Sequence, residues 1–568
     1  MPWKREQWQY LCLGLILVLL TLLVSCSQTA SPSGTSPTDD APSSQEPSIL
    51  RIGWKGAPDT LNPPMAFLTD SYTIFNLVYD TMYELALDNS YTPSLAEKVT
   101  TAADGKVWTY TIRSGVRWHD GEPLTAHDIA FTYNFYHDHP DFPYLPIYTE
   151  HFASVTAPDD ATLVITLDTP LPNLDSQLLF MYVLPAHIWG KYAADNTAAD
   201  YDNRDLVGSG PFKLISYEPN QYVHLAANPD YFGEQAKVDE VVFQTFANAD
   251  ALVQALQTGQ VDLITEIPKT ALATLRNAPN IKLATGSALS TEISDIFMNQ
   301  MDPAQCPTAD GGKCTGHPAL RDRTVRQALA HATDKQQIID VLLLGLGKPG
   351  LTLLPNTLRP WYNDSLTDYA FDLGKANQLL DEAGYKDSDG DGIREMPDGT
   401  TPLRFRLLWA DDTPDAPRMA ELISQSWRQI GVAVEPQTFS ADALLALCCP
   451  AYDYDIIIWG WTTDPDPNIL LKVMTSAAIP NGSNESGYTN PDYDDLYQEQ
   501  ATEMDPERRK ALVWQMQQMV FDDVVYIVPY YAEAAQAYRT DRFTGWLTDQ
   551  PSLMLEDHAS LVKVQPIP

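Results

Sequence analysis

The chain has 568 residues, of which 44% are hydrophobic, 20% charged and 10% aromatic, a composition typical of globular proteins. This length exceeds what a single hydrophobic core usually organises, so we expect two or more lobes. Lys and Arg number 36 against 75 Asp and Glu, which gives a net charge of -39. Such a field repels phosphate backbones, so the composition argues against nucleic acid as a partner and favours cationic or zwitterionic ligands.

The N-terminus carries the features of an export signal. Two basic residues precede an apolar run at residues 11–24, which is short for a membrane span. The run ends in the letters LVSC, which resemble a bacterial lipobox, so residues 1–25 are predicted to be a lipoprotein signal peptide and Cys26 the lipidated residue. Residues 26–48 are mostly small, polar and proline residues, which predicts a disordered tether. A plain membrane anchor with an incidental cysteine is the alternative.

The folded part of the chain alternates strands and helices in the manner of an α/β protein. Residues 71–84 carry apolar side chains on one side, which predicts a helix. Another helix is predicted to begin at Thr125, an N-cap with Asp128 three residues later, close to a capping box. Residues 249–258 predict a helix that ends at Gly259. Strands are expected at residues 49–54, 107–112, 161–167, 213–217, 222–227, 238–246 and 261–264.

The second half of the chain continues this alternation. Asp372 is predicted to cap a helix that ends at Gly384, and Asp505 followed by Pro506 to begin another. Other helices are expected within residues 321–345 and at 417–431, and strands at 403–409, 432–437 and 524–531.

Residues 454–467 join a buried strand to a stiff turn. Three consecutive isoleucines predict a strand that is covered on both faces. Trp459 and Trp461 end the strand, and Asp464 and Asp466 follow between prolines. Flat aromatic side chains and acids at a strand end could form a ligand site. The alternative is that the tryptophans belong to the core and the acids only form the turn.

Four cysteines remain once Cys12 and Cys26 are assigned to the signal peptide and the lipid site. An even number in an exported protein suggests disulfides. Cys306 and Cys314 bracket a glycine-containing loop and are predicted to form one. The state of the adjacent Cys448 and Cys449 stays open. Zinc is not favoured, because no histidine or second cysteine pair stands at ligand spacing.

An acidic loop at residues 387–398 has the spacing of a calcium loop. Asp387, Asp389 and Asp391 occupy its first, third and fifth positions, a glycine the sixth, Ile393 the seventh and Asp398 the twelfth. A structural calcium ion is one interpretation, with no other cofactor required. An acidic turn without metal is the other, because the usual glutamate at position twelve is replaced by a shorter aspartate.

No catalytic motif stands out elsewhere in the chain. His137 and His139, with other histidines nearby, could suggest a nickel or zinc site, but neighbouring prolines favour a solvated turn. A GxG at residues 208–210 is weak evidence for a phosphate loop, because no helix is expected after it. The hypothesis of an exported hydrolase therefore has no positive motif behind it.

Nine segments, in order along the chain, are similar to the extracellular solute-binding proteins of family 5. These lipoproteins bind oligopeptides and dipeptides and deliver them to ATP-driven importers. The resemblance covers nearly the whole chain after the tether. The segments read LRIGWKGAPDTLNP, NLVYDTMYE, PSLAEK, WTYTIRSGVRWHDGEPLTAHDIAFTY, VGSGPFKL, ANPDYFG, HPALRDRTVRQALAHATDKQQII, LLDEAGYKDSDGDGIRE and YDIIIWGWTTDPDP.

The resemblance implies a two-lobed α/β clamp like those of periplasmic binding proteins (class II, cluster C) with an additional accessory lobe. One lobe would be discontinuous and the ligand would lie in the cleft, which closes by a population shift. The implied limits are 49–86, 187–295 and 532–568 for lobe I, 87–186 for accessory lobe II and 296–531 for lobe III.

The resemblance also implies a ligand contact and a role. In this family an aspartate after the GW strand binds the α-ammonium of the ligand, and here that position is Asp464, with Trp461 and Trp459 as candidate walls. The protein is expected to be a monomeric, non-enzymatic receptor, lipid-anchored outside the cytoplasm, that passes peptides to the permease and ATPase subunits of an importer. An oligosaccharide, a nickel complex or haem is the alternative ligand.

Overall fold

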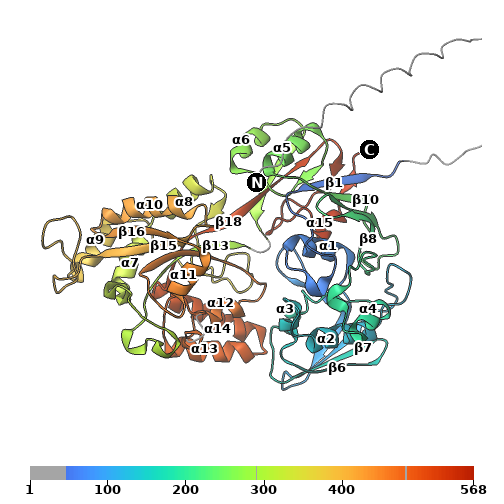
Figure 1. The fold of residues 1–568 in the computed structure, drawn as a ribbon, viewed down its shortest axis with the longest axis horizontal. Helices are drawn as coiled ribbons and strands as arrows, with labels where there is room; N and C mark the ends of the chain where they lie inside the picture. The colour runs from blue at the N-terminus through green and yellow to red at the C-terminus, as the bar shows by residue number, and fades with distance from the viewer. Residues whose placement is uncertain (1–45, 289–290, 480–482) are drawn as a thin grey trace, which may run out of the picture. The chain divides into compact units, whose positions relative to one another are not determined.

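The computed structural model describes residues 46–568 except 289–290 and 480–482. The predicted signal peptide, Cys26 and nearly all of the tether lie outside the described residues. One large mixed sheet organises the described chain, with strands in the order β16-β15-β17-β13-β18-β11-β1-β10-β9-β8 (Figure 1). Two further strands, β12 and β14, also pair with β18. The bounds are β1 (Ile49–Trp54), β8 (Phe212–Glu218), β9 (Tyr222–Ala227), β10 (Glu240–Thr245), β11 (Leu263–Ile264), β12 (Ile281–Ser287), β13 (Glu292–Met298), β14 (Gly347–Lys348), β15 (Arg404–Ala410), β16 (Ala433–Phe439), β17 (Ile456–Thr462) and β18 (Tyr526–Arg539).

The long strand β18 belongs to both halves of this sheet. Its residues 526–531 pair with β13, and its residues 533–539 pair with β12, both antiparallel. We therefore call residues 47–288 with 533–568 the first lobe and residues 291–532 the second lobe. The predicted limit at 295/296 falls inside β13, and the predicted three-lobe limits stay a prediction.

A separate four-stranded sheet lies within the first lobe, in the order β4-β5-β7-β6. Its core is continuous with that of β1, β10 and α1. The predicted capping box is confirmed: the Thr125 side chain accepts from the backbone of α2, and Asp128 accepts from the Thr125 N–H. The elements here are α1 (Thr69–Val78), β2 (Tyr83–Leu85), β3 (Tyr91–Pro93), β4 (Ala96–Thr101), β5 (Val107–Ile112), α2 (Ala126–Asp138), β6 (Phe152–Asp159), β7 (Thr162–Leu167), α3 (Leu174–Gln177) and α4 (Ala186–Ala194).

Short helices complete the first lobe. Helix α5 has the predicted bounds, because the Asn248 side chain caps its start and Gly259, at φ 76°, ends it in a left-handed conformation. The remaining elements are α5 (Ala249–Thr258), α6 (Leu272–Arg276), β19 (Phe543–Thr544), α15 (His558–Leu561) and β20 (Gln565–Pro566).

The sheet of the second lobe is covered on both faces, as the isoleucine run predicts. Ile456 and Ile458 belong to one buried cluster, and Ile457 belongs to another on the opposite face. The first cluster includes residues of α7 (Arg323–His331), α8 (Lys335–Leu342), α9 (Leu373–Glu382) and α10 (Ala416–Arg428). The second includes residues of α11 (Ala441–Cys448), α12 (Asn468–Lys472), α13 (Pro491–Thr502) and α14 (Pro506–Asp522).

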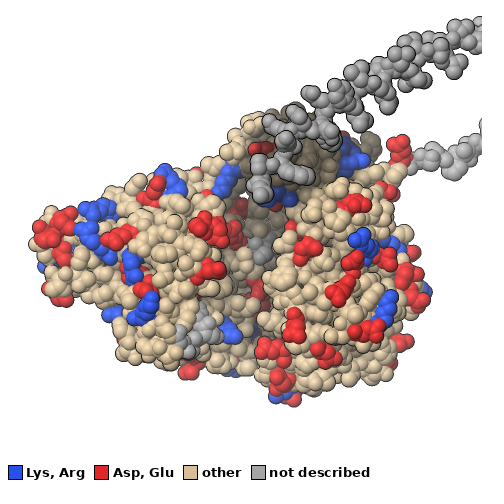
Figure 2. All heavy atoms as spheres, in the orientation of Figure 1, with Lys and Arg blue, Asp and Glu red and all other residues tan. Residues whose placement is uncertain are grey.

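The helices and the surface charge bear on the relation of the protein to membranes and ligands. None of the helices within the described ranges is both long and apolar enough to cross a membrane. Acidic side chains spread over the visible face, with basic ones fewer and scattered among them, in keeping with the net charge of -39 (Figure 2).

Candidate ligand-binding site

Asp464 lies in the turn that follows β17, two residues beyond the strand end. Its side chain is half-buried, yet no hydrogen bond or ion pair joins the carboxylate to another described residue. Burial raises the pKa of this carboxyl, and the charge of Asp466 raises it further. An acid held in this way gains stability from any cation that approaches it.

Asp466 has a different environment although it is only two residues away. Its side chain is buried and accepts two hydrogen bonds from the Arg509 guanidinium, at 2.6 and 2.9 Å. The Asn468 N–H and the Asn173 side chain also donate to it, at 3.0 and 3.4 Å. Asp466 therefore holds the turn in place, while Asp464 has no hydrogen-bond or ion-pair partner among the described residues.

The two predicted tryptophans lie on the face of β17 that carries Ile457, and both are partly buried against its cluster. The Trp461 Nε1 donates to Glu485 Oε2 at 3.3 Å, which orients the indole beside the turn. Trp459 lies opposite Asp295 of β13 in the sheet register. Both side chains thus combine core packing with partial exposure, and their predicted role as cleft walls stays a prediction.

Sequence reasoning missed the buried acids behind these tryptophans. Asp295 is fully buried, and neither of its carboxylate oxygens has a hydrogen-bond partner among the described residues. Burial raises the pKa of both Asp295 and Glu485, and the charge of Glu485 raises that of Asp295 further. The protonated form of both carboxyls is therefore favoured relative to exposed acids. The signal was present, because Asp295 interrupts the apolar run of a central strand.

Residues of the first lobe contact the turn that carries Asp464. The Tyr91 hydroxyl donates to the Pro465 carbonyl at 3.2 Å, and Asn173 reaches Asp466 as described above. Burial raises the pKa of the Tyr148 phenol, and the charge of Asp464 raises it further. The charge of Asp464, in the second lobe, therefore acts on a side chain of the first lobe.

Tyr148 is also part of a cavity of about 350 Å³ in the first lobe. We call it the tyrosine cavity, after its lining residues Tyr72, Tyr79, Tyr83, Tyr144, Tyr148, Tyr182 and Tyr231. Aromatic walls of this kind provide much apolar contact area, together with hydroxyl groups that can orient a ligand.

The residues that follow α1 line this cavity because the helix ends at Val78. The expectation of a helix through residue 84 is wrong, since α1 stops at Val78 and Tyr79 is extended. The Gly210 N–H donates to the Val78 carbonyl at 2.8 Å, which removes the acceptor that the next helical turn would use. A Cβ atom at Gly208 would lie 1.9 Å from the same oxygen, so this approach requires glycine.

Comparison with known proteins agrees with this architecture. The family model described as "Bacterial extracellular solute-binding proteins, family 5 Middle" matches residues 90–482. The chain belongs to this family. The predicted family and the two-lobed α/β clamp are therefore confirmed, and this family member is an extracytoplasmic solute receptor rather than an enzyme.

Individual relatives align with most of this chain. Oligopeptide-binding protein AppA of Bacillus subtilis is 27% identical over 539 residues, covering 93% of this chain and 94% of the relative. Heme-binding protein A of Haemophilus influenzae is 28% identical over 541 residues, covering 90% and 92%. The structure of the ABC transporter substrate-binding protein CtaP from Listeria monocytogenes has a TM-score of 0.75 at 25% identity, covering 92% of this chain and 100% of that one.

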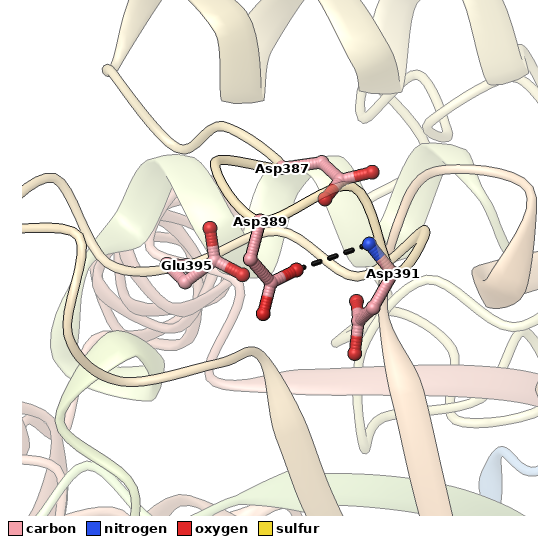
Figure 3. Close-up of side chains that lie close together, drawn as sticks. All are labelled: Asp387, Asp389, Asp391 and Glu395. Carbon is pink, nitrogen blue, oxygen red and sulfur yellow. Dashed lines mark hydrogen bonds between the residues drawn. The ribbon is translucent and has the colours of Figure 1, made fainter.

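The acidic loop of this solute-binding protein brings four carboxylates together (Figure 3). Asp387, Asp389, Asp391 and Glu395 each offer an oxygen, and these oxygens all lie within 4.8 Å of one another. Glu395 occupies the ninth position of the predicted loop. Asp398 is not a member of the group, because its carboxylate accepts from the Thr400 N–H and hydroxyl instead.

Calcium binding to this loop remains a prediction, and Arg404 opposes it by donating to Asp391 at 2.6 Å. We expect calcium added to chelator-treated protein to release heat and to stabilise the fold by about 2.7 kcal/mol at a hundredfold excess over Kd. Asp389→Asn should abolish both effects, whereas Glu435→Gln, which removes an exposed charge from β16, should change neither. Absence of heat and of any melting shift in the unmutated protein would refute calcium binding.

Both cysteine pairs are joined in the structure. Cys306 and Cys314 form the predicted loop disulfide, with an S–S distance of 2.03 Å. The adjacent Cys448 and Cys449 are joined as well, at 2.06 Å, which resolves the alternative that the sequence left open.

Proposed function

We propose that this protein is the lipid-anchored receptor of an ATP-driven importer, that Cys26 carries the anchor, and that the ligand is a peptide. The peptide would bind between the lobes with its α-ammonium on Asp464 and then pass to the permease. The state of Asp464 is the observation that supports this ligand class most, and the name of the relative AppA points the same way.

A free amino terminus supplies what Asp464 lacks. The carboxylate is half-buried and has no partner in the described part of the chain, and burial and Asp466 raise its pKa, so its charged form is disfavoured there. An ammonium group would form a charge-assisted hydrogen bond there and reverse this cost. The backbone of an extended peptide could then be bound with little demand on side-chain identity.

The test compares free and N-acetylated peptides. We expect isothermal titration calorimetry to show that acetylation of a bound tetrapeptide weakens binding by more than about tenfold, because it removes the charge that Asp464 would pair. C-terminal amidation of the same peptide is the matched control, since it removes the other terminal charge. Equal dissociation constants for the free and acetylated peptides would contradict the proposed role of Asp464.

Haem is the second candidate ligand, favoured by the 28% identity to Heme-binding protein A. Mass spectrometry and visible absorption of the protein as purified distinguish the two ligands directly. Peptide masses would support a peptide ligand. A Soret band, with haem in stoichiometric amount relative to the protein, would instead show that the ligand is haem.

A further inference from the structure

The tyrosine cavity contains acids as well as aromatic rings. Asp80, Glu84 and Asp557 all line it, whereas His558 is the one basic side chain and neither lysine nor arginine is among its lining residues. Glu84 is about a third exposed and lies 3.5 Å from His558. A concave site with this balance is electrostatically suited to a cation.

The surrounding fold holds one of these acids rigidly. Asp80 is buried and accepts hydrogen bonds from the Ser209 hydroxyl at 2.5 Å and the Tyr231 hydroxyl at 3.1 Å. The glycines that flank Ser209 are those that end α1 at Val78. The early end of α1 and the placement of Asp80 on the cavity wall therefore have the same cause.

The spacing of the acids argues against a metal ion. Among the described residues, the acidic loop at 387–395 is the one group of three or more potential ligands close enough to share an ion. The cavity acids are therefore spread around a larger volume. Such an arrangement is suited to an organic cation with several N–H donors, and a guanidinium is planar and also stacks on aromatic rings.

The cavity wall includes exposed aromatic side chains and a tyrosine on which the charge of Asp464 acts. The Phe67 and Tyr144 side chains are 57% and 51% exposed, with ring centroids 5.3 Å apart. Tyr148, whose pKa the charge of Asp464 raises, stacks on Phe180 with ring centroids 5.2 Å apart. An extended ligand anchored at Asp464 can thus direct a side chain past aromatic rings toward acids.

We infer that the tyrosine cavity is a subsite for a basic side chain, with arginine as the best occupant. This inference rests on the proposed function, because a peptide bound at Asp464 is what delivers the side chain. It makes the receptor selective for peptides that carry a positive charge near their amino terminus.

The experiment uses alanine tetrapeptides with arginine placed at each position in turn, each matched by a peptide with citrulline, the neutral isostere of arginine. We expect calorimetry on the full-length protein to show a preference of roughly tenfold for arginine at one position. Glu84→Gln and, separately, Asp80→Asn should reduce that preference to about threefold or less. Glu97→Gln, which removes an exposed charge on β4 of the same lobe, should leave it unchanged.

Two outcomes separate this inference from the proposed function. If the peptides bind and acetylation weakens them, but arginine and citrulline bind equally at every position, the subsite is overturned and the receptor role stands. Agmatine, which carries a guanidinium and an ammonium but no carboxylate, tests the cavity without a peptide, and the Glu84→Gln variant separates binding in the cavity from binding of the ammonium at Asp464. Agmatine binding that Glu84→Gln weakens would support the subsite even if no peptide binds, and failure of agmatine and of every arginine peptide would overturn it.

Discussion

Replacing Asp466 with asparagine should lower the free energy of unfolding by about 3–5 kcal/mol. The Arg509 side chain is only 3% exposed and makes two hydrogen bonds to this carboxylate. Its other partners are the Gln500 carbonyl and side chain and the face of the Trp361 ring. The substitution keeps the shape of the side chain but leaves the guanidinium charge buried without a counter-ion.

The matched control for this prediction is Asp464→Asn in the same turn. It removes the same charge from a half-buried carboxylate that has no partner within the described ranges, so its effect on the free energy of unfolding should stay within about 0.5 kcal/mol. Urea denaturation followed by circular dichroism measures both variants. Similar midpoints for the two would show that the Asp466–Arg509 pair does not hold the turn.

The same Asp464→Asn variant should lose affinity for peptides with a free amino terminus by more than about tenfold, or roughly 1.4 kcal/mol. The reason is that an amide cannot form the ion pair that compensates for burial at this position. N-acetylated peptides should bind the variant and the unmutated protein equally, so the two changes together form a double-mutant cycle.

Glu435→Gln removes an exposed negative charge from the same lobe, so it controls for the general effect of losing one charge. If N-acetylation still weakens peptide binding tenfold in the Asp464→Asn variant, the peptide amino terminus binds to another acid. Asp295 and Glu485, buried behind Trp461, would then be the next residues to replace.

Local sequence patterns were sufficient for features that depend on neighbours along the chain. The isoleucine run of β17, the capping box at Thr125 and the bounds of α5 appear as predicted, because buried periodicity and helix caps are properties of short segments. Together with the order of motifs along the chain, they were enough to predict the family and the two-lobed α/β clamp.

Only the tertiary structure decided which side chains have partners. Asp464 and Asp466 are equivalent in the letters DPDP, and Arg509 on α14 separates their roles by pairing with just one of them. Gly210, far along the chain from α1, ends that helix at Val78, and the extended residues that follow Val78 line the tyrosine cavity. Burial and ion pairing join residues distant in sequence, so no local pattern can assign a free acid or an acidic cavity.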